Sequence, residues 1–272
     1  MVRLAFVTVS FFTLTGGLFA VLWLLAALKL PGRRQVGRGY FRLLARLMRA
    51  RIRVVGAPAD GQAALIVANH VSWLDIPVIG ASFPAVFVAK REIAGWPVIG
   101  LGAKLLHTVF VDRARRQQTG DATAEIARRL TDGDSVVLFA EGTSSDGNRV
   151  LPFRSALVGA ANEVLGQLGP ASRVIVQPLS VCYTGLQGLP MGRQHRPVVA
   201  WYGDLDFLPH LKEYIRRGAV DAVVTFGEPI AYEARADRKE LARSLENTVR
   251  RMTVQALRGP AAEALAIRPE RR

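Results

Sequence analysis

Residues 64–75 read ALIVANHVSWLD, and the pattern of this segment sets the fold class. Its first five residues, Ala64–Ala68, are all apolar, which is typical of a strand that is covered on both faces. Polar side chains begin abruptly at Asn69 and His70, and Asp75 follows five residues after the histidine. The segment therefore predicts a buried strand that delivers polar groups to one edge of a sheet, where α/β proteins bind their ligands.

Similar short apolar runs recur on the carboxyl side of this segment and alternate with stretches of helical periodicity. Alternation of this kind predicts an α/β fold in which helices sandwich one mixed β-sheet. The predicted strands are 52–56, 64–68, 86–89, 108–111, 135–139, 173–181, 198–202 and 219–226, and the predicted helices lie near 74–82, 96–106, 119–131, 154–167 and 237–257.

The N-terminal segment has a different composition. From Leu4 to Leu28 no residue is charged. As a helix this segment would extend ~37 Å, more than the ~30 Å thickness of the bilayer hydrocarbon. It is also longer than the apolar region of a cleaved signal peptide, and it runs into Lys29 and an arginine block. We expect a membrane helix, or a hairpin if the chain breaks at the paired Gly16 and Gly17.

The positive charge of the chain is concentrated behind this apolar run. The whole chain has 36 Lys and Arg against 22 Asp and Glu, a net charge of +14. Residues 1–53 hold ten of these basic residues and no acidic one. A nucleic-acid-binding protein usually spreads its basic surface over the folded domain, so this asymmetry favours a bilayer and predicts no nucleic-acid partner.

Residues 38–53 carry arginines at intervals of three or four, which predicts a basic amphipathic helix. Such a helix can lie at the membrane surface, or it can pack its apolar side on the domain and leave the arginines in solvent. The positive-inside rule predicts the cytoplasmic membrane, with the catalytic domain on its cytoplasmic face. The expected organisation is an anchor over residues 1–53, one α/β domain over 54–258 and a basic tail over 259–272.

The sequence lacks the residues and motifs of several classes of enzyme. A single cysteine, Cys182, allows no internal disulfide and no cysteine-based metal site, and there are only four histidines. The motifs of serine hydrolases, P-loop NTPases, zinc metalloproteases and dinucleotide enzymes are missing. We therefore expect no bound metal and no bound cofactor.

His70 and Asp75 can form a pair if a turn brings the carboxylate back to the imidazole. The carboxylate would fix the tautomer of the ring, and the second ring nitrogen would accept a proton from a hydroxyl group. This is the two-residue half of a catalytic triad, without a serine, so the nucleophile would be the substrate's own hydroxyl. Taken alone, the same spacing is also typical of a helix cap beside a satisfied histidine.

A second polar segment follows another predicted strand. Residues 139–147 read FAEGTSSDG and directly follow the strand predicted at 135–139. Two further apolar strands carry residues that matter for the comparison below. The first is followed by the charged pair Asp112 and Arg113, and the second, which contains Val174–Leu179, is interrupted by Pro178. Proline within a strand predicts a sheet edge or a bulge at that position.

In this order the segments resemble the glycerolipid acyltransferase family, typified by bacterial 1-acylglycerol-3-phosphate acyltransferases. The resemblance covers about residues 50–230. The family motif Asn-His-x4-Asp is matched by Asn69, His70 and Asp75; Phe-Pro-Glu-Gly-Thr-Arg-Ser is matched at Phe139, Glu141, Gly142, Thr143 and Ser145; and single positions are matched by Lys90, Arg113 and Pro178.

The resemblance implies transfer of an acyl group from an acyl carrier protein or coenzyme A thioester to a lipid hydroxyl, without a covalent acyl-enzyme. It assigns the catalytic roles to His70 as base and Asp75 as the residue that holds the ring. Backbone amides near His70 or in the 141–143 loop would stabilise the oxyanion. Substrate contacts are expected from Asn69, Lys90, Arg113, Glu141, Gly142, Thr143, Ser144, Arg149 and Arg154.

Two positions depart from the family pattern. Ala140 replaces the proline before Glu141, and Ser144 replaces the arginine that binds the acceptor phosphate. The run over residues 141–155 looks like the branch that acylates lyso-ornithine lipid, whose head group has a carboxylate and an amine. Asp146 would then meet the amine, unless Asp146 and Gly147 form a plain turn.

Two other functions stay open. Arg113, Arg149 and Arg154 are available to bind phosphate, so an enzyme that converts 1-acyl-sn-glycerol-3-phosphate to phosphatidic acid is one alternative. A non-catalytic, membrane-tethered lipid-binding protein is the alternative of another class. In every case the expected partners are the bilayer and a single-chain lipid.

Overall fold

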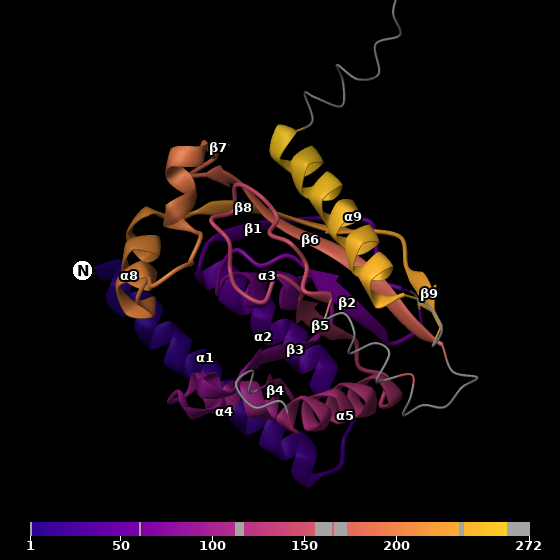
Figure 1. Cartoon of the computed structure of the whole chain (residues 1–272). Helices are drawn as coiled ribbons and strands as arrows, with labels where there is room; N and C mark the ends of the chain where they lie inside the picture. The colour runs from indigo at the N-terminus through magenta and orange to yellow at the C-terminus, as the bar shows by residue number, and fades with distance from the viewer. Residues whose placement is uncertain are drawn as a thin grey trace, which may run out of the picture.

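A computed structural model describes residues 2–59, 61–111, 117–155, 165, 173–233 and 237–259 of the chain. Nine strands form one sheet whose path is β1-β8-β6-β2-β5-β3-β4, with β7 and β9 also paired to β6 (Figure 1). The strands are β1 Ala50–Val55, β2 Ala64–Ala68, β3 Val86–Lys90, β4 Val109–Val111, β5 Val136–Phe139, β6 Val174–Leu186, β7 Leu189–Pro190, β8 Val220–Phe226 and β9 Ile230–Tyr232.

The sheet is mixed, as the sequence predicts. β2 runs parallel to both of its neighbours, β5 and β6, while β8 runs antiparallel to β6. The described helices are α1 Val2–Ala27, α2 Arg33–Leu47, α3 Asp75–Ser82, α4 Ile99–Leu105, α5 Gln117–Thr131, α8 Phe207–Arg217 and α9 Arg238–Arg258, with short 3-10 helices η1 Arg91–Gly95 and η2 Arg193–Val198.

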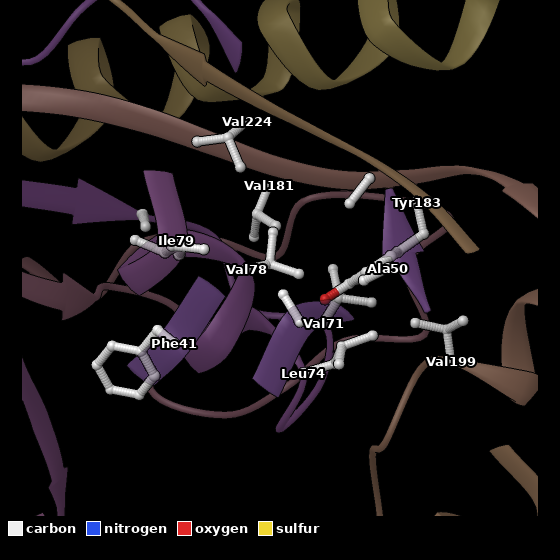
Figure 2. Close-up of a cluster of buried hydrophobic side chains, with 14 of the residues drawn as sticks. Phe41, Ala50, Val71, Leu74, Val78, Ile79, Val181, Tyr183, Val199 and Val224 are labelled. Carbon is white, nitrogen blue, oxygen red and sulfur yellow. The ribbon is translucent and has the colours of Figure 1, made fainter. Parts of the chain in front are cut away.

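Helices cover both faces of the sheet because alternate residues of the central strands are apolar on both sides. Ile66 packs with α2 and α3 on one face, whereas Leu65 and Val67 pack with α5 and α9 on the other. Figure 2 shows the first of these layers, with Phe41 of α2 and Val78 of α3 against the strands, and α9 beyond the strands. The α/β sandwich predicted from the sequence is confirmed.

The apolar N-terminal segment is one helix, α1, which is long and apolar enough to cross a membrane. It continues through Gly16 and Gly17 without a break, so the predicted hairpin alternative is wrong. The helix lies along α2 and also contacts α4 and α8. Its polar contacts include a hydrogen bond from Arg3 Nη1 to the Gly218 carbonyl (2.9 Å) and one between Thr15 and Tyr40 hydroxyls (2.9 Å).

The basic helix predicted over residues 38–53 lies instead at Arg33–Leu47. It ends there because Arg49 adopts a left-handed backbone conformation, with φ of 56°, and the chain then enters β1. Arg51 and Arg53 are therefore strand residues. Part of the basic face packs on the domain, since Arg38 and Arg42 donate hydrogen bonds to the Ala81 carbonyl at the end of α3.

Pro178 lies in a central strand, so the prediction of an edge or a bulge at this position is wrong. β6 pairs with β9 up to Val176 and with β8 from Leu179 onward, and Pro178 falls between these two ladders. Its missing N–H group is thus tolerated where the neighbouring strand changes. The irregularity in β6 occurs later, between Tyr183 and Gly185.

Three other predicted elements differ from the structure. Residues 198–202 form the end of η2 and a loop, not a strand. The helix predicted at 96–106 is found as the shorter α4, Ile99–Leu105, with η1 ending just before the predicted range, and α8 was not predicted. Of the helix predicted near 154–167, only residues 154, 155 and 165 lie within the described part of the chain, and of the tail over 259–272 only residue 259 does.

Candidate active site

Three adjacent strands deliver the candidate catalytic groups to one end of the sheet. His70 follows the last paired residues of β2, and Glu141 lies two residues beyond β5. Tyr183 lies in β6, on the other side of β2 and four residues past the pairing of Ala68 with Leu179. Because β2, β5 and β6 are parallel, these residues converge at the carboxyl edge predicted from the sequence.

Asp75 is the first residue of α3, and its side chain has no exposure to solvent. One carboxylate oxygen, Oδ2, accepts hydrogen bonds from His70 Nδ1 (2.7 Å), from the Val71 amide (2.7 Å) and from the Ser72 amide (3.0 Å). The other oxygen, Oδ1, accepts one from the Tyr183 hydroxyl (2.7 Å). A buried carboxylate needs such donors to remain ionised.

His70 is placed to act as a base. Its Nδ1 faces the Asp75 carboxylate, which can only accept, so Nδ1 carries the proton of the neutral ring and Nε2 keeps its lone pair. The ring stacks on Phe139, with centroids 4.0 Å apart and planes inclined by 20°. The histidine side chain is 20% exposed while that of Asp75 is fully buried. A reactant can thus approach the ring but not the carboxylate.

Glu141 joins the two polar loops. Its Oε2 accepts from the His70 amide (3.3 Å) and its Oε1 accepts from the Leu151 amide (2.9 Å). Burial raises the pKa of Glu141 to about 8, against the opposing effect of these two hydrogen bonds. The side chain therefore fixes the loop that carries His70 to the loop after β5, and both of its oxygens are occupied.

Asn69 extends the pairing of β2 and β6 beyond the last backbone bonds. Its amide nitrogen donates to the Val181 carbonyl (2.9 Å), and its oxygen accepts from the Val181 amide (2.9 Å). The residue is 2% exposed. Its side chain thus mimics a strand and sets the point at which the chain turns toward His70.

The loop after Gly142 is bonded directly to the His70 segment. The Ser145 amide donates to the His70 carbonyl (2.8 Å), and the Trp201 amide donates to the Val71 carbonyl (3.0 Å). The Ser144 hydroxyl donates to the Trp201 carbonyl. The position at which the resemblance implies a phosphate-binding arginine is therefore occupied by a serine that ties two loops together.

Asp146 is a charged group in the same loop. Its carboxylate accepts two hydrogen bonds from Asn148, one from the backbone amide (2.9 Å) and one from the side chain (3.0 Å). Burial opposes its ionisation, but these bonds and the nearby Arg149 and Arg196 lower the pKa of Asp146 below its ordinary value. The loop thus carries a stable negative charge.

Two of the predicted cationic residues, Arg149 and Arg154, belong to the segment that follows β5. Arg154 lies against Gly142, where a Cβ atom would come within 2.8 Å of its Nε. Gly142 also has a φ of +73°, a backbone conformation that favours glycine. Arg149 and Arg154 are exposed, as are Thr143 and Lys90, the last residue of β3. Arg113 lies outside the described residues.

Comparisons with known proteins find acyltransferases. A family model described as Acyltransferase matches residues 51–182. A lyso-ornithine lipid O-acyltransferase from Brucella abortus is 47% identical over 258 residues, which cover 95% of this chain and 96% of that protein. The chain belongs to the acyltransferase family. A 1-acyl-sn-glycerol-3-phosphate acyltransferase from Neisseria gonorrhoeae is 39% identical, but over only 39% of this chain and 41% of that protein.

The acyltransferase fold is also found in a solved structure. This chain is similar in structure to the 1-acyl-sn-glycerophosphate (LPA) acyltransferase PlsC from Thermotoga maritima, whose crystal structure is known. The match covers 97% of this chain and 100% of the PlsC chain, with a TM-score of 0.56. Sequence identity is 22%, so this likeness concerns the fold. The likeness extends over α1 and α2 as well as over the sheet.

One residue of the acyltransferase site was missed from the sequence. Tyr183 contacts Asp75 although 107 residues separate them in the chain. The signal was present in β6, where Leu179, Val181 and Tyr183 alternate on the face that packs with α3. A tyrosine at an inward position of a buried strand needs a partner for its hydroxyl. Only the strand order, with β6 beside β2, identifies that partner.

The part of the chain that the structure describes contains no group of three or more His, Cys, Asp or Glu side chains that could hold a metal ion. Cys182 is buried and its neighbours in β6 are apolar. Burial raises the pKa of its thiol to about 12, which keeps it protonated and unreactive.

Proposed function

We propose that this acyltransferase moves a fatty acyl group from a thioester to the hydroxyl of lyso-ornithine lipid. The observation that carries the proposal is the 2.7 Å contact between His70 Nδ1 and Asp75 Oδ2, which leaves the second ring nitrogen, Nε2, as the base of a partly exposed side chain. Both residues of this pair lie in the segment that the family model matches, 51–182.

In the proposed reaction the acceptor hydroxyl gives its proton to His70 Nε2 as its oxygen attacks the thioester carbonyl. The C–O bond forms, the C–S bond breaks, and the departing thiolate takes the proton back from Nε2. Asp75 holds the ring and stabilises its positive charge during the step. A thioester is reactive enough that no serine relay is needed, so no covalent acyl-enzyme forms.

The oxyanion donor belongs to the loop after β5. The amides of His70, Val71 and Ser72 all donate to the carboxylates of Glu141 and Asp75. They are therefore not available to the substrate carbonyl. We assign the donor role to the backbone at Thr143 and Ser144, because the Ser145 amide bonds the His70 carbonyl and keeps this loop beside the ring.

The head-group preference follows from charge. Ser144 cannot supply the bidentate cation that suits a phosphate, and its hydroxyl is already bonded to Trp201. Asp146 supplies a negative charge for an ammonium group, and Arg149 and Arg154 supply positive charges for a carboxylate. This combination favours a zwitterionic acceptor over lysophosphatidic acid.

We further propose that α1 holds the enzyme on the cytoplasmic membrane with its site on the cytoplasmic face. After Arg3 the helix carries no charged residue, and residues such as Phe6, Phe12 and Trp23 are more than half exposed. Exposed aromatic and aliphatic side chains of this number are typical of a lipid-facing surface. The donor is either an acyl carrier protein or a coenzyme A thioester.

Competition between two acceptors tests the proposed function. The purified full-length protein in detergent receives equal amounts of lyso-ornithine lipid and lysophosphatidic acid with one acyl donor, and the products are identified by mass. We expect acylated ornithine lipid to dominate. Dominant formation of phosphatidic acid would contradict the acceptor assignment, and absence of both products with either donor would contradict the enzymatic assignment.

A further inference from the structure

The second oxygen of Asp75 has a partner that the proposed reaction does not use. Oδ2 accepts three hydrogen bonds from the His70 loop itself, but Oδ1 is held by the Tyr183 hydroxyl at 2.7 Å. In the described part of the chain this is the one hydrogen bond found for Oδ1. The orientation of the carboxylate thus depends on a residue from a distant strand.

The Tyr183 side chain is buried and closely packed. It is 4% exposed and belongs to the apolar cluster between the sheet and α3. Figure 2 shows its ring entering that cluster from β6, with the oxygen directed toward the segment that carries Val71. Burial raises the pKa of Tyr183 well above its ordinary value, so the hydroxyl keeps its proton at neutral pH and acts as a donor.

Such a donor has two physical effects on the carboxylate. It prevents rotation of the Asp75 side chain, because turning the carboxylate would break the bond to Oδ1 and the three bonds to Oδ2 together. It also draws negative charge toward Oδ1 and away from the His70 ring, so the carboxylate acts less strongly on the ring than an unshared one would.

We propose that Tyr183 is a positioning residue for acyl transfer, acting on His70 through Asp75. It does not touch the reactants. The inference rests on the proposed function, in which His70 is the base. Nothing in the two matched motifs identifies this residue, because it lies in β6, beyond Pro178.

The chain contains a matched control. Tyr214 on α8 is a second buried tyrosine of the same cluster, and its hydroxyl donates to the Met48 carbonyl (2.8 Å). Tyr183→Phe and Tyr214→Phe therefore remove the same chemical group, and each removes one buried hydrogen bond. They differ in whether that bond ends on Asp75.

The test measures kcat/KM against pH for both variants of the full-length protein in detergent. We expect Tyr183→Phe to lower kcat/KM by about 10- to 100-fold, the loss typical of a misplaced catalytic group. We also expect its low-pH limb to move to higher pH, since the carboxylate then directs its whole charge at the imidazole. Tyr214→Phe should keep kcat/KM within about twofold, with an unmoved profile. Equal losses in both variants, with superimposable pH profiles, would overturn the proposal.

A double-mutant cycle shows whether Tyr183 acts through Asp75. In an Asp75→Asn background we expect Tyr183→Phe to change the residual rate by less than about twofold, because the carboxylate on which it acts is gone. Losses that multiply in the double variant would overturn the proposal. Failure of the proposed function looks different: His70→Ala would then retain the wild-type rate, whatever the result for Tyr183→Phe.

Discussion

Asp75 and Asp134 are buried carboxylates at opposite ends of the central sheet, and they differ in the partners that surround their negative charges. Asp134 lies two residues before β5, is 3% exposed, and pairs with two guanidinium groups of α2: Arg33 at 3.3 Å and Arg34 at 2.5 Å. Asp75 lies at the other end, and over the described residues its one ion-pair partner is His70. Its other donors are neutral.

The difference separates a structural tether from the proposed catalytic pair. Two cations cancel the charge of Asp134, so its role is to fasten α2, and with it α1, to the sheet. The amides and the phenol that donate to Asp75 are neutral and do not cancel its charge, which is therefore left to act on the imidazole. The two ends can be tested separately.

The largest effect is expected at the catalytic end. His70→Ala removes the base, so we expect loss of nearly all turnover. The ring is partly exposed and the contact it loses to the core is its stacking on Phe139, so thermal unfolding should stay within a few degrees of wild type. Initial rates with a radiolabelled acyl donor, beside a melting curve, check both statements. A wild-type rate in this variant would remove His70 from the mechanism.

At the tether end we expect an effect on stability and none on chemistry. Asp134→Asn leaves Arg33 and Arg34 without their counter-charge, which should lower the free energy of unfolding by about 2 kcal/mol. The value lies below that of a fully buried pair because both arginines reach solvent. Urea unfolding measures it, and kcat of the folded variant should match wild type. A tenfold fall in kcat without a change in stability would erase the distinction between the two ends.

The third carboxylate, Glu141, makes stability depend on pH. Its folded pKa of about 8 exceeds that of an unfolded glutamate, so between about pH 4.5 and 8 the unfolded chain binds fewer protons. The free energy of unfolding then falls as pH rises, by up to about 1.4 kcal/mol per pH unit. Urea titrations at pH 5.5, 6.5 and 7.5 should show this slope in wild type and a flatter one in Glu141→Gln. Parallel slopes would mean that Glu141 ionises normally.

The smallest effect concerns acceptor choice. Ser144→Arg restores the family's cation, so we expect the ratio of lysophosphatidic acid to lyso-ornithine lipid turnover to rise about fivefold, as for an exposed ion pair of ~1 kcal/mol. Ser144→Ala, which also loses the bond to Trp201 but adds no charge, is the control. An equal ratio in both variants would show that this position does not read the head group.

The sequence predicts the parts of the site that are local. The buried strand 64–68 and the polar run behind it place His70 and Asp75 within one turn, and the structure confirms that they meet. Glu141 follows from the same reasoning, because it also lies directly after a buried strand. Only the sandwich, and not the strand order, follows from the alternation of strands and helices.

The long-range contacts were not predictable without that order. Tyr183 reaches Asp75 because β6 is the neighbour of β2, and Arg34 reaches Asp134 because α2 packs near the start of β5. Local patterns also misled in places. Pro209 in the first turn of α8 hid a helix, although the first turn tolerates proline, and the apolar run at 198–202 suggested a strand that the structure replaces with a loop.

The most direct test compares Asp75→Asn with Asp134→Asn in one acyl-transfer assay, because each removes one negative charge from a buried aspartate. Loss of the Asp75 charge should reduce kcat by about 10⁴-fold, as in triads whose aspartate is neutralised, while Asp134→Asn stays within about twofold of wild type at a temperature where it is folded. A folded Asp75→Asn variant that works as fast as Asp134→Asn would contradict the account.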